Sequence, residues 1–206
     1  MAITNGYTSL AVYKQRFYDE GQGDVKDDAA IEAVITAVSR SIDNICWQRF
    51  YTTAANETRY YTAEFSEWLR LPDRIASTSP TLKTDNDSDR TYENTWTLGT
   101  DYDLLPYNAV VDGEPYRWIE VTPNGSYRFP KGVAKGVEIL GKFGWSAAPG
   151  PVVEACLLAS HRLMARRNSP YGVSGAAAVG NLTLTVEKMK SDPDIMELLS
   201  PYIMRF

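Results

Sequence analysis

The chain has 206 residues, a formal net charge of −5 at pH 7 and a sequence pI near 5.0, which argues against a dedicated duplex-DNA binder with a basic face. Hydrophobic residues make up 44% and charged residues 23%, which argues against a disordered chain and for a globular unit with extensions. No apolar run approaches the roughly 18 residues that span a bilayer, and the N-terminus lacks a secretory pattern, so we expect synthesis in a cytoplasm and no membrane partner.

Two helices are predicted near the N-terminus. The first covers residues 10–17, where Thr8 or Ser9 can cap the helix by accepting unpaired amide hydrogens. The second covers residues 25–49, because apolar side chains recur there at three- and four-residue steps and form one stripe. The stripe consists of Ile31, Val34, Ile35, Val38, Ile42, Ile45 and Cys46.

Residues 51–145 have the composition of antiparallel strands, with Thr, Tyr, Trp and Val between closely spaced turn residues. The predicted strands are 58–62, 67–71, 81–83, 91–97, 116–121 and 133–143. The turn Thr122-Pro-Asn-Gly125 has proline where φ is preset and glycine where a left-handed residue is convenient, so we expect a hairpin there.

Strand 116–121 carries large apolar groups on both faces. One face has Arg117, Ile119 and Val121, and the other has Tyr116, Trp118 and Glu120. We therefore expect one face to meet the helices and the other to meet a neighbouring subunit.

The part of the chain after the strands begins with a proline-bounded corner, Ser146-Ala-Ala-Pro-Gly-Pro151, and an amphipathic helix over residues 152–168. Residues 172–180 are small and glycine-rich and predict a linker, and residues 181–186 predict a strand or an extended arm.

A last helix is predicted at the C-terminus. Asp192 is a suitable cap and Pro193 a suitable first helical residue, while Pro201 should kink or end the helix. Its apolar stripe consists of Ile195, Leu198, Leu199, Tyr202 and Ile203.

Together these elements predict an α+β fold with packed helices, an inserted antiparallel β lobe and a C-terminal docking helix. Residues 1–50 and 146–171 would form the helical core. Residues 51–145 would form the inserted β lobe, and residues 172–206 a flexible arm with the C-terminal helix.

The sequence predicts no catalytic, cofactor-binding or metal-binding residue. Residues 136–143 match a phosphate loop at both glycines and the lysine, but Phe143 replaces the hydroxyl that would hold magnesium, and the intervening residues favour a strand. The run Asp85-Asn-Asp-Ser-Asp89 begins like a calcium loop, but Arg90 stands where that loop needs glycine. We interpret it as a solvated acidic turn.

The remaining chemistry-bearing residues also have ordinary interpretations. His161 is the only histidine and is interpreted as a helix-surface residue, since neither cysteine has metal-ligand spacing. Cys46 and Cys156 fall on apolar helix faces and are interpreted as buried free thiols.

Aromatic and arginine side chains leave alternatives open. The 13 tyrosines and 5 tryptophans could form a stacking platform for sugars or unpaired bases, although core packing and subunit contact explain their spread better. Arg162, Arg166 and Arg167 could face a DNA channel, or could complement the negative end of their helix.

Several packing motifs follow one another in order along the chain. They are the helix over residues 27–43, Arg49-Phe50, Thr58-Arg-Tyr-Tyr61, Tyr102-Asp-Leu-Leu-Pro106, Gly141-Lys-Phe-Gly-Trp145 with Pro149 and Pro151, and Leu198-Leu-Ser-Pro-Tyr202. In this series the chain resembles the head-tail connector (adaptor, or neck-ring) proteins of long-tailed, siphophage-like phages and related gene-transfer particles.

The resemblance implies a structural role in the virion neck, without catalysis or a cofactor. The chain would form a homo-oligomeric ring, usually of twelve copies, joining the portal at the capsid vertex to the next neck or tail-completion protein. DNA would pass through the axial hole without specific binding, which suits a mildly acidic protein.

Because the family's C-terminal segments commonly dock on the portal, the stripe of Ile195, Leu198, Leu199, Tyr202 and Ile203 is predicted to bind the portal or an adjacent subunit. The alternative is that the stripe folds back onto the chain's own core. The runner-up function is an aromatic-rich binding module for carbohydrate or single-stranded nucleic acid, and a third is a small enzyme of unrecognised type.

Overall fold

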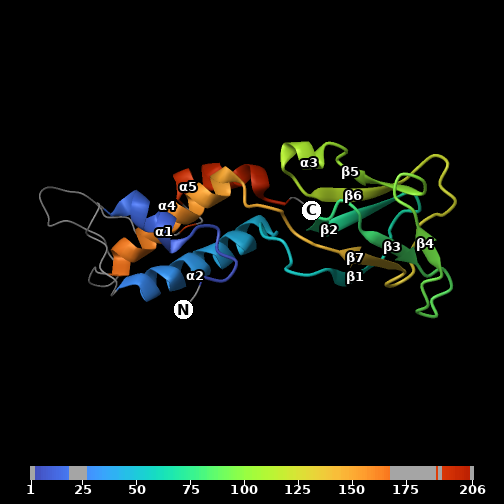
Figure 1. Ribbon diagram of the computed structural model, residues 1–206, viewed down its shortest axis with the longest axis horizontal. Coiled ribbons are helices and arrows are strands. Elements are labelled where there is room, and N and C mark those ends of the chain that lie inside the picture. The colour runs from blue at the N-terminus through green and yellow to red at the C-terminus, as the bar shows by residue number, and fades with distance from the viewer. Residues whose placement is uncertain (1–2, 19–26, 168–188, 190–191, 205–206) are drawn as a thin grey trace, which may run out of the picture. The chain divides into compact units, whose positions relative to one another are not determined.

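The computed structural model describes residues 3–18, 27–167, 189 and 192–204 of the chain. The chain divides into two compact units, unit 1 with residues 1–48 and 148–206 and unit 2 with residues 49–147 (Figure 1). Among the described residues, every strand lies in unit 2 and the longer helices lie in unit 1, so the chain is α+β with antiparallel sheets, as predicted. No described helix combines the length and apolar character needed to cross a bilayer.

Helix α1, Leu10–Phe17, begins unit 1 as predicted. The hydroxyl of Ser9 caps it by accepting a hydrogen bond from the amide of Val12 at 3.2 Å. Its single buried side chain, Tyr13, faces the other helices of the unit. The cap therefore fixes the start of α1, and Tyr13 defines the face that the helix buries.

Helix α2, Asp28–Cys46, carries the predicted apolar stripe, and six of its seven members are buried. It ends at Cys46 rather than at residue 49, because Trp47 adopts a left-handed conformation with φ of 56°. The predicted start of this helix at residue 25 lies outside the described residues.

Helix α4, Gly150–Arg167, packs against α2 and also against α5, Pro193–Leu199 (Figure 1). Asp192 caps α5, and a 3-10 turn over Ser200–Tyr202 follows where Pro201 was expected to end the helix. The predicted linker and arm, residues 172–186, lie outside the described residues.

Unit 2 is built from two antiparallel sheets. The four-stranded sheet has the order β1-β7-β3-β4, from Glu57–Tyr61, Val137–Gly141, Thr81–Thr84 and Asn94–Trp96. The three-stranded sheet has the order β2-β6-β5, from Trp68–Ile75, Tyr116–Val121 and Tyr102–Leu105. A short helix, α3, Ala109–Asp112, follows β5.

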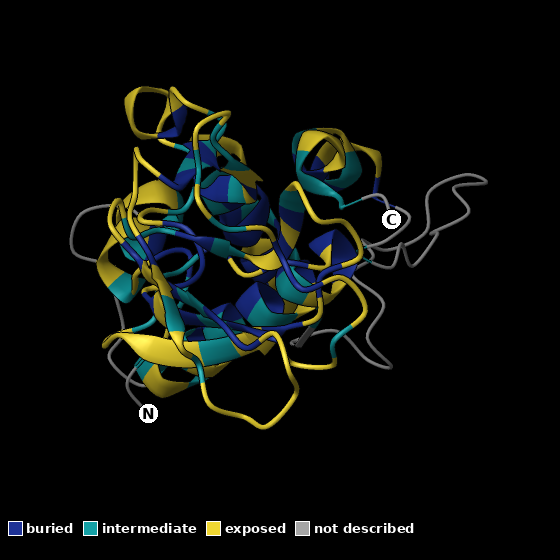
Figure 2. Cartoon of the chain, turned by 90° about the vertical axis from the view of Figure 1, so that its right-hand side faces the viewer, coloured by how far each residue is buried: buried dark blue, intermediate teal, exposed yellow. Residues whose placement is uncertain are grey.

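The core of unit 2 lies between these sheets, because alternate residues of each strand point inward. The four-stranded sheet contributes Leu82, Trp96, Val137 and Ile139, and the three-stranded sheet contributes Leu69, Leu71, Tyr102, Leu104 and Ile119. Buried residues lie inside the unit and exposed residues on its outer side (Figure 2). The outer faces of the two sheets therefore lie on opposite sides of unit 2.

The predicted hairpin at Thr122-Pro-Asn-Gly125 is wrong. The turn itself forms, since the amide of Gly125 donates to the carbonyl of Thr122 at 3.0 Å. However, β6 pairs with β2 and β5, while β7 pairs with β1 and β3, so the turn does not join paired strands. Turn chemistry is local, whereas strand pairing is decided by the whole core.

Two other expectations about unit 2 also change. The inward face of strand 116–121 packs on the other sheet rather than on the helices, and Ile119 is fully buried there. The strand Tyr102–Leu105 was not predicted, because four residues before a proline give too short an alternation to recognise.

Candidate functional site

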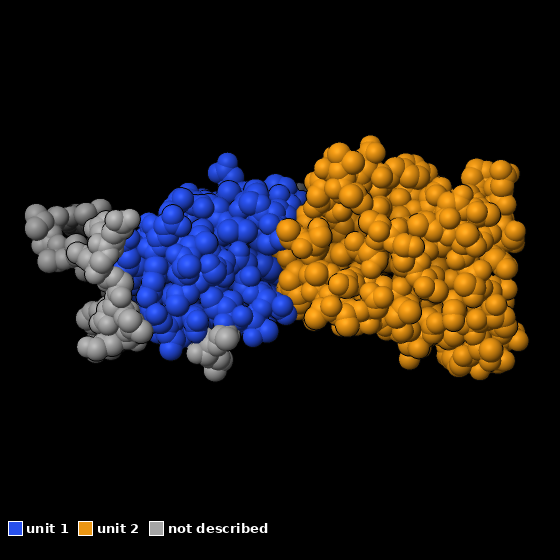
Figure 3. Space-filling view, in the orientation of Figure 1, with its two compact units in different colours: residues 1–48, 148–206 blue, residues 49–147 orange. Residues whose placement is uncertain are grey.

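The C-terminal stripe belongs to unit 1, which is coloured blue in Figure 3. Ile195 and Leu199 are 1% and 0% exposed, so they are part of the core of this unit. Leu198, Tyr202 and Ile203 are half-buried and keep part of their surface accessible. The structure therefore divides the predicted portal-binding stripe into two residues that stabilise the chain and three that a partner can reach.

The segment after α5 is also held against the end of α2. The side-chain amide of Gln48 donates to the carbonyl of Tyr202, and the amide of Met204 donates to the carbonyl of Cys46 at 3.0 Å. The second bond satisfies a carbonyl at the end of α2 that has no partner within its own helix. The described C-terminal segment is thus part of the folded helical unit.

Arg162 links α4 to the start of α5. Its guanidinium forms ion pairs with Asp192, which is almost fully buried, and with Asp194 at 2.6 Å. Hydrogen bonds to these two carboxylates raise the pKa of Arg162 further above its ordinary value. Of the three predicted channel-facing arginines, Arg162 therefore has a structural partner, and the side chain of Arg167 lies outside the described part.

A groove of about 570 Å³ runs between α2, α4 and α5 in unit 1. Ala37, Ser41 and Ile45 line it from α2, and Leu163 and Arg166 line it from α4. Leu163 is 42% exposed. Unit 1 therefore has a partly apolar groove beside α5.

Aromatic side chains gather on the outer face of the three-stranded sheet. Phe65 and Trp68 stack with ring centroids 4.3 Å apart, and Trp68 meets Trp118 edge-on at 5.4 Å. Phe65 is 44% exposed and Trp118 36% exposed. Because these rings cover one another, they offer less free ring face than a stacking platform for sugars or bases needs, and their exposed edges suit a protein contact better.

The acidic turn that begins at Asp85 is a structural loop. The carboxylate of Asp85 accepts hydrogen bonds from the amides of Asp87, Ser88 and Arg90 at 3.1, 2.7 and 2.9 Å. Burial alone would raise the pKa of Asp85, but these hydrogen bonds outweigh it and hold the pKa below its ordinary value. The prediction of a turn is confirmed, whereas the prediction that it is solvated is wrong for Asp85, which is fully buried.

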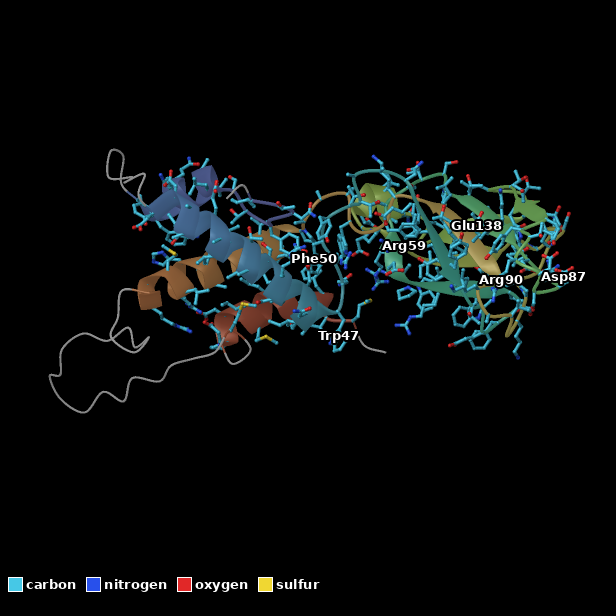
Figure 4. All side chains as sticks on the ribbon, turned by 90° about the horizontal axis from the view of Figure 1, so that it is seen from below. Trp47, Phe50, Arg59, Asp87, Arg90 and Glu138 are labelled. Atoms are coloured by element: carbon cyan, nitrogen blue, oxygen red, sulfur yellow. The ribbon has the colours of Figure 1, made fainter. Side chains whose placement is uncertain are left out.

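The same loop brings four carboxylates together. Oxygens of Asp85, Asp87, Asp89 and Glu93 lie within 4.8 Å of one another, and Figure 4 shows Asp87 and Arg90 at the end of unit 2. Carboxylate oxygens of Asp85, Asp87 and Asp89 accept backbone amides of the loop. Their first role is to hold the backbone of the turn, and the cluster gives no second sign of a cation.

The residues considered for nucleophilic chemistry have packing roles. His161 stacks on Phe17 with centroids 4.0 Å apart, and burial lowers the pKa of its imidazole. Cys46 and Cys156 are buried free thiols, as predicted, and burial raises the pKa of both, to about 12 for Cys46. A thiol with a raised pKa is a poor nucleophile at neutral pH.

The segment that partly matches a phosphate loop is a central strand. Residues Val137–Gly141 form β7, which pairs with β1 on one side and β3 on the other. Its amides are therefore used by the sheet and cannot cradle phosphates. The interpretation of this motif as a strand is confirmed.

No family model matches the sequence, and a search of curated proteins finds no match. Solved structures do match. A chain from the neck of an empty GTA particle, computed with C6 symmetry, aligns with a TM-score of 0.58 at 18% identity over 100% of this chain and 94% of that chain. A chain from the neck of the native GTA particle, computed with C12 symmetry, aligns with a TM-score of 0.56 at 18% identity and the same coverage.

A third similar chain comes from the virion of a native gene transfer agent (GTA) particle, with a TM-score of 0.56 at 20% identity, again over 100% and 94% of the two chains. This chain has the fold of a gene transfer agent neck chain. The likeness extends over both units, so it includes the helical unit and the β unit together.

Sequence reasoning placed Glu120 on the same face as Trp118 but missed Asp103, the other carboxylate beside the aromatic face. The two carboxylates lie directly opposite each other on β5 and β6. The available signal was that Tyr102 and Leu104, which are buried, alternate with Asp103 and Leu105. The position of Asp103 opposite Glu120 follows only from the pairing of β5 with β6.

Proposed function

We propose that this chain is a structural neck protein that forms a ring at the head-tail interface of a phage-like particle. The observation that supports this proposal is the likeness, over the full chain, to neck chains whose structures were computed with C6 and C12 symmetry. In this proposal the ring lies under the portal, receives the next neck or tail component on its other side, and leaves an axial opening for DNA.

The proposed portal contact uses the accessible part of the C-terminal stripe. Leu198, Tyr202 and Ile203 are half-buried in the free chain, and burying an apolar side chain contributes about 1.5–3 kcal/mol when the burial is complete. Ile195 and Leu199 would support this surface from beneath, because they anchor α5 to the helical unit. The portal contact is thus presented on a rigid element.

The proposed channel carries DNA without gripping it. A net charge of −5 per chain repels phosphates over the distance that salt screening allows, about 8 Å at physiological ionic strength. Within this proposal Arg166 and Arg167 remain the candidates to face the lumen, whereas Arg162 holds the start of α5.

The experiment is electron microscopy in negative stain, with mass photometry, of the purified protein alone and mixed with the portal ring. We expect rings, alone or capped onto the portal. Removal of all of α5 would expose the core of unit 1, so point variants are the better probe: Leu198→Asp with Ile203→Asp should abolish portal binding without changing the ring.

Val12→Asp is the matched control, because Val12 is a 43% exposed apolar residue of the same unit outside the stripe. It should bind the portal like the unmodified chain. A protein that stays monomeric at high concentration and does not assemble on the portal contradicts the proposed function. Portal binding that survives Leu198→Asp with Ile203→Asp contradicts only the assignment of the stripe.

A further inference from the structure

Both outer faces of unit 2 expose large apolar side chains. On the three-stranded sheet, Trp68 and Trp118 lie on the outer face. On the four-stranded sheet, Tyr60 is 48% exposed and Leu140 is 38% exposed. The water-facing side of an antiparallel sheet is usually polar, so exposed apolar groups at the centre of both faces indicate two contact surfaces.

The three-stranded face also carries unpaired negative charge. Asp103 and Glu120 lie directly opposite each other across β5 and β6, and Glu67 joins them around a groove of about 370 Å³. Like charges directly opposite each other destabilise a sheet. Two cations of the same subunit lie on this face: Arg128 lines the groove and donates to the carbonyls of Gly125 and Tyr127, and Arg70 lies 5.7 Å from the centre of the Trp118 ring. Among the described residues none of the three carboxylates forms an ion pair, so the groove keeps an excess of negative charge that a cation from a neighbouring subunit would relieve.

The four-stranded face carries two lysines and one glutamate around its apolar centre, which leaves an excess of positive charge. Lys83 lies directly opposite Glu138 of β7, and Figure 4 labels Glu138. The ammonium group of Lys135 lies 6.0 Å from the centre of the Tyr60 ring. Tyr92 stacks on Tyr60 at 5.8 Å and extends the apolar area. Neither lysine forms an ion pair with any residue that the structure describes.

The two faces therefore differ in charge and lie on opposite sides of the same sandwich. A symmetric dimer needs one surface that matches itself, whereas a closed ring needs two different surfaces that match each other. We propose that the three-stranded face of one copy docks on the four-stranded face of the next copy, head to tail around the ring. This inference rests on the proposed function, and it names the partner of both faces as a second copy of this chain.

In this contact the lysines of one copy meet the carboxylates of its neighbour. Lys83 and Lys135 approach the groove formed by Glu67, Asp103 and Glu120, and the aromatic rings of the two faces exclude water at the centre. Complementary charge sets the register of such an interface and disfavours the reverse pairing, in which like charges meet.

Charge reversal tests the pairing. One variant combines Lys83→Glu with Lys135→Glu, and the other combines Asp103→Lys with Glu120→Lys. Each variant alone should assemble roughly tenfold more weakly or worse, since it places like charges against each other at every contact. An equimolar mixture should restore rings in which the two variants alternate, because each reversed face then meets a reversed partner.

Assembly is measured by mass photometry and negative stain, alone and on the portal, and circular dichroism confirms that each variant is folded. Lys131→Glu is the control, since Lys131 is exposed and lies outside both sheets, and it should assemble normally. Rings that persist in both reversed variants, or a mixture that fails to restore them, overturn the head-to-tail pairing. An unmodified chain that never assembles overturns the proposed function itself, and this pairing with it.

Discussion

The packing of α5 gives the sharpest test of how the C-terminal segment is used. Leu199 is 0% exposed in unit 1, whereas Leu163, on α4, is 42% exposed. Replacing either residue by alanine removes the same three carbon atoms in a helix. The difference between the two variants therefore measures burial and not helix propensity.

The expected magnitudes follow from the exposed fractions. Three carbon groups at about 0.8 kcal/mol each give about 2.4 kcal/mol for Leu199→Ala, and the cavity that remains brings the cost to about 3 kcal/mol. For Leu163→Ala, where almost half of the side chain is already in water and no closed cavity forms, we expect about 1 kcal/mol. A total stability of about 5–15 kcal/mol would tolerate both changes.

The assay is urea denaturation followed by the helical circular dichroism signal, which reports mainly on unit 1 because α1, α2, α4 and α5 belong to it. With a slope of about 2 kcal/mol per molar urea, Leu199→Ala should lower the midpoint by about 1.5 M and Leu163→Ala by about 0.5 M. Equal shifts for the two variants would show that α5 does not pack on α4 in solution, and the whole stripe would then be available to a partner.

Two further predictions concern local structure. Asp85 has a pKa held below its ordinary value, so its contribution to stability is complete above about pH 4 and is lost as the pH falls through the lowered pKa. Thermal unfolding should show that the Asp85→Asn variant is less stable than the unmodified protein at pH 7 and that its stability depends less on acid. Parallel curves of stability against pH for the two proteins would refute this. Ser9→Ala removes the cap of α1 and should cost about 1 kcal/mol, whereas Ser9→Asp should retain most of the stability; equal stability of all three proteins would contradict the capping role.

The helical elements could be predicted because their signals are local. Ser9 and Asp192 each accept a backbone amide within three residues, so the chain positions at which α1 and α5 begin can be recognised without any knowledge of the fold. The stripe of α2 is equally local, since a helix brings residues three and four apart onto one face. The end of α2 was less visible, because a tryptophan in a left-handed conformation has no sequence signature.

The candidate surfaces could be predicted only in part. The sequence indicated that Trp118 and Glu120 share a face, but the opposing positions of Asp103 and Glu120 depend on the register of β5 against β6. The burial of Asp85 likewise depends on a loop that folds its own amides around the carboxylate. Whether Ile195 and Leu199 face a partner or the chain's own helices was open, and the structure places them in the core of unit 1.

By itself, the sequence determined the α+β class, the caps and the apolar stripes, because each of these depends on residues within a few positions of one another. Only the tertiary structure decided that β1 pairs with β7, which follows it by about eighty residues, and hence which sheet faces remain exposed. The free energy of such long-range pairing depends on contacts throughout the core and on the entropy lost when long loops close. No local pattern in the sequence contains this information.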